Sequence, residues 1–167
     1  SDTEMPPETG ITDAARVVDR QIREATQRDT PLLIRGAPGL GKLRLARRVH
    51  EQSDRRAAPC IVVDVLRNPV DTIGLDRAID EARDGSMILV GVGRLTLEAQ
   101  DRLLESLKAP AFRLMATAGL RIEERGGDNF RADLLALLRS HEIVIPSLVE
   151  RPEDAVWLAT HLLPRFN

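Results

Sequence analysis

The feature that most constrains this chain is a glycine-rich segment, GAPGLGK, which spans Gly36 to Lys42. A short apolar run, PLLIRG, leads into it, and a helical pattern, GKLRLARRVHEQS, leads out of it. A turn between a buried strand and a helix gathers backbone N–H groups around one point, and the helix dipole and the lysine add positive charge there. The pattern predicts a phosphate-binding loop, made of Gly36, Ala37, Pro38, Gly39, Leu40, Gly41, Lys42 and Leu43. A bare strand-to-helix turn is the alternative, but such a turn does not need the lysine.

The residue after the lysine argues against a bound metal. A Ser or Thr at this position normally ligates magnesium, and Leu43 has no oxygen to offer. Magnesium is therefore not expected, and no residue is assigned as a metal ligand. The single cysteine, Cys60, is expected to be a buried strand thiol, and the three histidines are scattered without metal-ligand spacing.

A second acidic component is also needed for hydrolysis of a nucleotide. An apolar strand normally ends in Asp-Glu, where the Asp acts through the metal and the Glu orients or deprotonates the attacking water. The third apolar run, SMILVGVG, offers Val90 and Gly91 instead. Asp64 closes the second run, CIVVDV, but it stands alone, and an Asp at a strand end is more often a turn or cap residue. No catalytic residue is therefore assigned.

Apolar strand patterns alternate with amphipathic helix patterns along the chain. This order predicts an α/β fold with a parallel sheet covered on both faces. One domain, 11–167, is expected after a flexible lead-in, 1–10. In the helix 69–83, Ile73, Ala78, Ile79 and Ala82 are expected to face inward, and Thr96 is expected to cap the next helix. The expected strands are 31–36, 60–65, 86–93, 111–118 and 142–148, and the expected helices are 11–28, 41–53, 69–83, 97–108, 129–139 and 151–163.

The composition excludes several classes of function. The 167 residues are 43% hydrophobic and 30% charged, with a net charge of −2, so no long-range field attracts nucleic acid. Aromatic residues are too few to favour stacking on bases. No signal peptide and no membrane-spanning apolar run occurs, so we expect a cytoplasmic protein with no membrane partner.

Four longer segments follow one another along the chain: PLLIRGAPGLGKLRLARRVHEQS, DGSMILVGVGRLTLEAQDRLLESL, FRLMATAG and FRADLLALL…IVIPSLVERPEDAVWLATHLL. In this order they resemble the AAA+ domain of bacterial enhancer-binding proteins, the ATPases that remodel RNA polymerase carrying sigma-54. The similarity extends from Ile11 to Asn167, and FRADLL…IPSLVERPED is its most specific part. It implies a P-loop NTPase (AAA+) three-layer sandwich with a five-stranded parallel sheet, and ATP or ADP as the ligand.

The chain also departs from this family at the positions that carry catalysis. The family's Asp-Glu pair aligns with Val90 and Gly91, and its sensor residue, usually Asn, aligns with Gly119. Of two arginines that reach a neighbouring subunit's phosphate, Arg131 matches and the second falls at Leu137. The sequence is equally consistent with Arg131 being an exposed arginine at the start of a helix, without an inter-subunit role.

Other parts of the family are missing from the sequence. The loop with GAFTGA, which touches the sigma factor, belongs between the second and third strands, but 64–86 has room for only a helix and two turns. Direct contact with sigma-54 is therefore not expected. The helical lid and a helix-turn-helix segment are also expected to be absent from this stretch, so DNA contact would need a further domain.

These features favour a degenerate sigma-54-activator-type domain that serves as a regulatory or assembly module in a transcription regulator. It is expected to bind ATP or ADP, to hydrolyse it poorly or not at all, and to pair with itself or with a related AAA+ protein. Two alternatives stay open. One is a working ATPase in which Asp64 or Asp84 serves the metal, and the other is a scaffold that no longer binds nucleotide.

Overall fold

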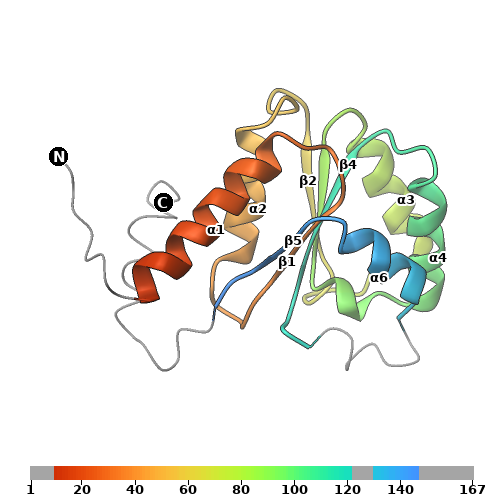
Figure 1. Cartoon of the computed structure of the whole chain (residues 1–167). Helices are drawn as coiled ribbons and strands as arrows, with labels where there is room; N and C mark the ends of the chain where they lie inside the picture. The colour runs from red at the N-terminus through yellow and green to blue at the C-terminus, as the bar shows by residue number, and fades with distance from the viewer. Residues whose placement is uncertain (1–9, 122–129, 147–167) are drawn as a thin grey trace.

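The structure, a computed structural model, describes residues 10–121 and 130–146. Five strands form one sheet in the order β2-β3-β4-β1-β5, and all neighbouring strands are parallel. Helices α1 and α2 cover one face, and α3, α4 and α6 cover the other (Figure 1). The predicted three-layer α/β sandwich is confirmed. The strands are β1 (Leu32–Arg35), β2 (Cys60–Asp64), β3 (Ser86–Val90), β4 (Arg113–Ala118) and β5 (Glu142–Val144).

The sheet is apolar on both sides, which is why its central strands read as continuous hydrophobic runs. In β1, Leu32 and Ile34 pack toward α1 and α2, whereas Leu33 packs toward the opposite layer. All three side chains are fully buried. Burying each of these side chains stabilises the fold by about 1.5–3 kcal/mol. The sheet therefore separates two hydrophobic cores, one on each of its faces.

The helices follow the predicted apolar periodicity in most places. Ala15, Val18, Ile22 and Ala25 of α1 are all buried, as their helical spacing indicates. Thr96 caps α4, as predicted, because its Oγ1 accepts a hydrogen bond from the backbone N–H of Ala99 at 3.1 Å. The helices are α1 (Gly10–Thr26), α2 (Lys42–Glu51), α3 (Thr72–Glu81), α4 (Leu97–Ser106) and α6 (Ala132–Leu138), with a 3-10 turn, η1 (Val92–Arg94).

The prediction for Ile73 is wrong. Asp71 caps α3, and the buried stripe then runs through Leu75, Ala78 and Ala82. Ile73 precedes Leu75 by two residues, which turns it roughly 200° away from that stripe at about 100° per residue. Its side chain is therefore 68% exposed.

The third strand is shorter than predicted. β3 ends at Val90 rather than at residue 93, because Gly91 has a φ of +81° and the chain then turns into η1. Positive φ is outside the range of a strand, and glycine reaches it without steric penalty. Cys60 lies in a strand as predicted, but β2 is an edge strand and the thiol is only half-buried. Burial raises its pKa, which disfavours the reactive thiolate.

The connection between β2 and β3 contains only turns and α3, as predicted from its length. No helix in residues 10–121 and 130–146 is long and apolar enough to cross a membrane. The predicted helix 151–163, most of the lead-in 1–10 and the end of the fifth strand lie outside the described residues.

Candidate nucleotide-binding site

The predicted phosphate loop connects β1 to α2 at the carboxyl edge of the sheet. Gly39 and Gly41 have φ values of +83° and +75°, which glycine adopts readily and other residues rarely do. Gly36 is fixed to the sheet, because its N–H donates to the Ala118 carbonyl at 3.1 Å and a Cβ on it would come within 3.2 Å of the Ile145 Cβ. The glycine pattern therefore forms a tight turn between strand and helix at this edge, as the sequence predicts.

The loop and the start of α2 present free donors. Within the described ranges, the backbone N–H groups of residues 39–43 donate no hydrogen bond. Gly41 is the N-cap of α2 and supplies no side chain to cover them. A Cβ built on Gly39 would meet nothing within 4 Å, so the space above the loop is open. Unpaired donors at a helix N-terminus favour an anion through their partial positive charge.

Lys42 adds the positive charge that the motif requires. Its Nζ donates to the carbonyl oxygens of Gly36 at 2.6 Å and Ala37 at 3.1 Å, so the ammonium lies over the loop itself. Burial lowers the pKa of Lys42, because desolvation disfavours the charged form. A phosphate at the loop would compensate that cost, and the residues present fit a polyphosphate group.

Leu40 and Leu43 make the loop more apolar than the motif requires, and both have a packing role. Both are partly buried and pack against the core between the sheet and the layer of α1 and α2. At position 43 a leucine contributes to packing where a hydroxyl would ligate magnesium. In the described residues, no cluster of three or more His, Cys, Asp or Glu side chains could hold a metal ion.

The carboxyl end of β3 carries no acid in the structure. Val90 is the last strand residue, and the N–H of Gly91 donates to the carbonyl and the hydroxyl oxygen of Thr117 in β4, at 3.1 and 3.2 Å. A Cβ on Gly91 would approach the Cγ and Cδ2 of Leu66 to 2.4 and 2.5 Å. The place where an acidic side chain would begin is therefore filled by Leu66.

The two candidate aspartates lie at opposite edges of the sheet, Asp64 at the end of β2 beside Val90 and Asp84 before the start of β3. The Oδ1 of Asp64 accepts hydrogen bonds from the N–H groups of Leu66 and Arg67, both at 3.1 Å, which makes it a turn residue. Asp84 precedes β3, so it lies at the amino edge of the parallel sheet. At about 3.3 Å per residue, the five residues of β3 put it roughly 16 Å from the edge that carries the loop.

Arg131 is held within its own chain. Its guanidinium pairs with Asp101 at 2.5 Å and with Asp133 at 2.9 Å, and hydrogen bonds to both carboxylates raise its pKa. Its backbone N–H donates to the buried Oε1 of Gln100 at 2.8 Å. These contacts join the start of α6 to α4. Leu137, at the position of the second arginine, is 40% exposed.

Sequence reasoning missed two polar residues that shape the site. Arg35, at the end of β1, is buried and pairs with Glu142 of β5 at 2.8 Å, and it also donates to the Leu120 carbonyl. Thr117 is buried and fixes Gly91. Both are polar residues inside apolar strand patterns, and such an interruption is the sequence feature from which they could have been predicted.

Fold and loop together define a P-loop NTPase-type α/β domain. The family model described as "Sigma-54 interaction domain" matches residues 10–148. The chain belongs to this family, and its resemblance to the AAA+ domain of sigma-54-dependent activators is confirmed.

Relatives of the chain are transcription regulators. The phenol regulator MopR of Acinetobacter guillouiae is 30% identical over the whole chain, which covers 35% of MopR. A Nif-specific regulatory protein of Azorhizobium caulinodans is 28% identical over 95% of the chain and 31% of its own length. The chain thus spans about a third of these relatives. The MopR alignment runs over 198 positions against 167 residues here, so 31 positions have no counterpart in this chain.

Solved structures show the same fold. NtrX from Brucella abortus, crystallised with ATP, superposes with a TM-score of 0.77 at 21% identity, over 97% of this chain and 41% of NtrX. The P-loop NTPase domain of a sigma-54 activator from E. coli superposes with a TM-score of 0.65 at 22% identity, over 76% of this chain and 98% of that domain. At these identities the likeness supports the fold alone.

Proposed function

We propose that this domain binds ATP or ADP through residues 36–43 but hydrolyses it poorly or not at all, and that it acts as a regulatory or assembly module of a transcription regulator. The observation that carries the proposal is a contrast within one site. The loop keeps two glycines at positive φ, open donors and Lys42, whereas the end of β3 has Leu66 over Gly91 where an acid would stand. NtrX, which shares this fold, was crystallised in complex with ATP, and this supports a nucleotide as the ligand.

In the proposed function the site binds the nucleotide but does not activate a water molecule for hydrolysis. The N–H groups of the loop and of the first turn of α2 bind the phosphate oxygens, and the ammonium of Lys42 transfers from the Gly36 and Ala37 carbonyls to the phosphate. The apolar residues at 40 and 43 hold the loop on the core. The end of β3 offers no carboxylate to orient a water or a magnesium ion, and in this proposal the nucleotide serves as a structural ligand.

Partners follow from the same proposal. A domain that binds nucleotide without turning it over acts by contact, and we propose a second copy or a related AAA+ protein as its partner in the cytoplasm. Direct contact with sigma-54 is not proposed, because the connection between β2 and β3 consists of α3 and turns and lacks GAFTGA. DNA contact is not assigned to this domain, whose net charge is −2.

The experiment is a titration with a fluorescent ATP analogue, combined with a phosphate-release assay with and without magnesium. The Lys42→Ala variant should weaken binding by about 100-fold, which is about 2.7 kcal/mol and in the range of a charge-assisted contact. Lys108→Ala is the matched control, because Lys108 is the other lysine of the chain and lies just after α4, paired with Glu105 at 3.1 Å. It should bind like the unmodified domain.

Two outcomes contradict the proposal. A magnesium-dependent release of phosphate that Lys42→Ala abolishes would identify a working ATPase. An unmodified domain that binds neither ATP nor ADP at about 1 mM, the weak end of meaningful affinity, would identify a scaffold that has lost the ligand.

A further inference from the structure

Two apolar side chains occupy the positions from which this class of site normally binds magnesium. Leu43, in the first turn of α2, stands where a Ser or Thr hydroxyl is a metal ligand, and Val90, the last residue of β3, stands where the strand normally ends in Asp. Both are partly buried and pack against the hydrophobic cluster between the sheet and the layer of α1 and α2. These two residues therefore do not fit the magnesium ion that the fold family implies.

Val90 faces the layer that contains α2. It is paired in register with Thr117 of β4, which is paired with Ile34 of β1, and Ile34 is buried in the cluster against which Leu43 packs. Side chains that are level across neighbouring strands share one face of the sheet. Leu43 and Val90 therefore lie on the same side of the sheet, at the edge where the loop leaves β1.

The hydration of magnesium makes such apolar side chains unfavourable neighbours. The ion binds oxygen ligands in near-octahedral geometry and gives up its waters reluctantly, so an ion held by phosphate alone keeps several of them. The methyl groups of Leu43 and Val90 accept no hydrogen bond, and waters that face them lose the hydrogen bonds that they make in bulk solvent. A nucleotide without the metal brings no such waters to these side chains.

Asp64 is level with Val90 but lies one strand further from the loop. The order β2-β3-β4-β1 puts β2 three strand spacings from β1, which is roughly 14 Å at about 4.8 Å per spacing. Its Oδ1 already accepts hydrogen bonds from the N–H groups of Leu66 and Arg67. Asp64 thus stabilises its own turn, and its distance from β1 separates it from a metal bound to phosphate at the loop.

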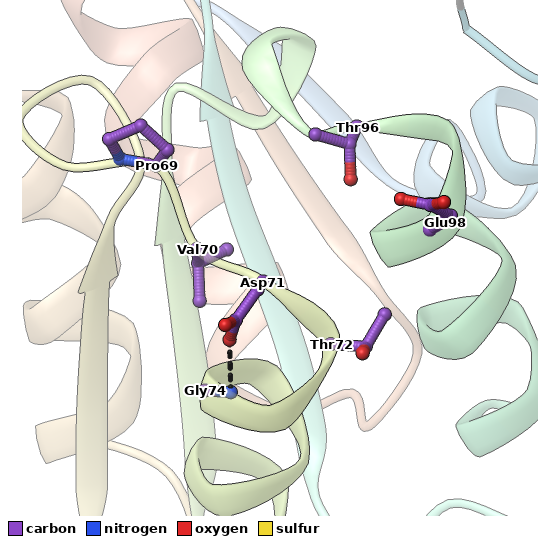
Figure 2. Close-up of a pocket in the computed structure, with 7 residues that line it drawn as sticks. All are labelled: Pro69, Val70, Asp71, Thr72, Gly74, Thr96 and Glu98. Atoms are coloured by element: carbon purple, nitrogen blue, oxygen red, sulfur yellow. Dashed lines mark hydrogen bonds between the residues drawn. The ribbon is translucent and has the colours of Figure 1, made fainter.

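Two further carboxylates at the same edge of the sheet lie on its opposite face. Figure 2 shows Asp71 at the start of α3 and Glu98 at the start of α4, where both line one hollow. Helices α3 and α4 cover the face away from α2, and the Oδ1 of Asp71 accepts a hydrogen bond from the Gly74 N–H at 2.7 Å. The sheet therefore separates both acids from Leu43 and from the first turn of α2.

We infer that the site selects the nucleotide without its metal, so that magnesium acts against binding instead of supporting it. The loop itself supplies the positive charge that the phosphates need, through its N–H groups and the ammonium of Lys42. Magnesium in solution binds the nucleotide and thereby removes the species that the site accepts, which raises the apparent dissociation constant. This inference rests on the proposed function and adds the form in which its ligand binds.

The test is a titration of the full chain with fluorescent analogues of ADP and ATP, in EDTA and in magnesium chloride at equal ionic strength. The ionic strength is matched because salt alone screens the attraction between Lys42 and phosphate. Magnesium should raise the apparent dissociation constant by about tenfold or more, since the loss of a single supporting group around a metal already costs about 10–100-fold in affinity. At low magnesium the rise should be larger for ATP, whose additional phosphate holds the ion more tightly.

Returning the two oxygen ligands should reverse the magnesium effect. Leu43→Thr adds the hydroxyl and should reduce the rise, and Leu43→Thr combined with Val90→Asp should make magnesium tighten binding. The single variant decides the test where the double variant does not fold. Leu97→Thr is the matched control, because Leu97 is also a leucine in the first turn of a helix and is 47% exposed. Asp64→Asn keeps an oxygen for the turn but removes the charge, and it should leave the magnesium effect unchanged.

Three results overturn the inference and leave nucleotide binding intact. The first is binding that magnesium tightens or leaves unchanged, and tightening that Asp64→Asn abolishes would identify Asp64 as the metal ligand. The second is a magnesium effect that Leu43→Thr does not reduce. The third is an equal rise for ADP and ATP at low magnesium, which would place the ion on the protein. Absence of binding at about 1 mM nucleotide in both EDTA and magnesium contradicts the proposed function itself, and this inference with it.

Discussion

The two halves of the proposed nucleotide site, the loop after β1 and the end of β3, differ in what surrounds their glycines. At the loop after β1, Gly39 has a φ of +83° and a Cβ there would meet nothing within 4 Å. At the end of β3, Gly91 has a nearly equal φ of +81°, but a Cβ there would lie 2.4 Å from the Cγ of Leu66. One glycine faces open space above a row of free donors, and the other is covered by a leucine.

The difference follows from how each half is built. In the proposed function the loop binds phosphate largely with backbone N–H groups, which every residue except proline carries, so a residue such as Leu43 leaves them in place. The other half depends on two carboxylates, and a single substitution at each position removes them. A domain that loses hydrolysis by substitution therefore has no structural reason to lose the phosphate loop with it.

The largest expected effect tests the covered glycine. Gly91→Ala should lower the free energy of unfolding by about 1.5–3.5 kcal/mol, because positive φ costs a non-glycine residue about 1–2 kcal/mol and turning the exposed Leu66 side chain aside adds about 0.5–1.5 kcal/mol. Adding Leu66→Ala should recover the overlap part, since Leu66 is exposed and its loss creates no cavity. Urea denaturation of the single and double variants measures the coupling.

Gly39→Ala is the matched control for that cycle. It has the same backbone strain but no neighbour to meet, so it should cost only about 1–2 kcal/mol and show no coupling to Leu66→Ala. An equal loss of unfolding free energy at the two glycines would show that Leu66 does not occupy the position above Gly91. The two halves of the site would then not differ in the way described here.

The sequence predicted the loop half better than the β3 half. GAPGLGK between a strand and a helix is a local pattern, and its glycines hold the positive φ values that such a turn requires. That Val90 and Gly91 carry no acid at the end of the third strand is likewise visible in the sequence. Leu66 above Gly91 was not, because the two residues are distant in the chain and their contact depends on the pairing of β2 with β3.

The wrong prediction for Ile73 has a local cause. Ala78 and Ala82 are buried as predicted, but Leu75 rather than Ile73 completes their stripe, because Leu75, Ala78 and Ala82 are spaced three and four residues apart on one helix face. The ion pair of Arg131 with Asp101 could not be predicted, because Asp101 lies on another helix.

A smaller effect is expected for Arg131→Ala, which tests whether Arg131 takes part in the nucleotide site at all. Since its two carboxylate partners are in its own chain, Arg131→Ala should lower the melting temperature only slightly and leave nucleotide affinity and phosphate release unchanged. The difference in melting temperature should shrink at high salt, because exposed ion pairs are screened. An effect on nucleotide turnover, seen only at concentrations where copies associate, would instead show that Arg131 reaches a neighbour's phosphate.

The smallest expected effect is the pH dependence of binding at the loop. Burial lowers the pKa of Lys42 below its ordinary value of 10.5, so the free domain loses this charge at a lower pH than an exposed lysine would. Only the ammonium attracts phosphate, and the affinity for ADP should therefore be flat near neutral pH and fall as the pH rises through that lowered pKa. Lys42→Arg keeps a charge across this range, because the pKa of arginine is above about 12, and its affinity should stay level. Titrations with fluorescent ADP at several pH values between neutral and alkaline measure both proteins. A parallel fall in the two would place the titrating group outside the loop, and Lys42 would then lose its assigned part in holding the phosphate.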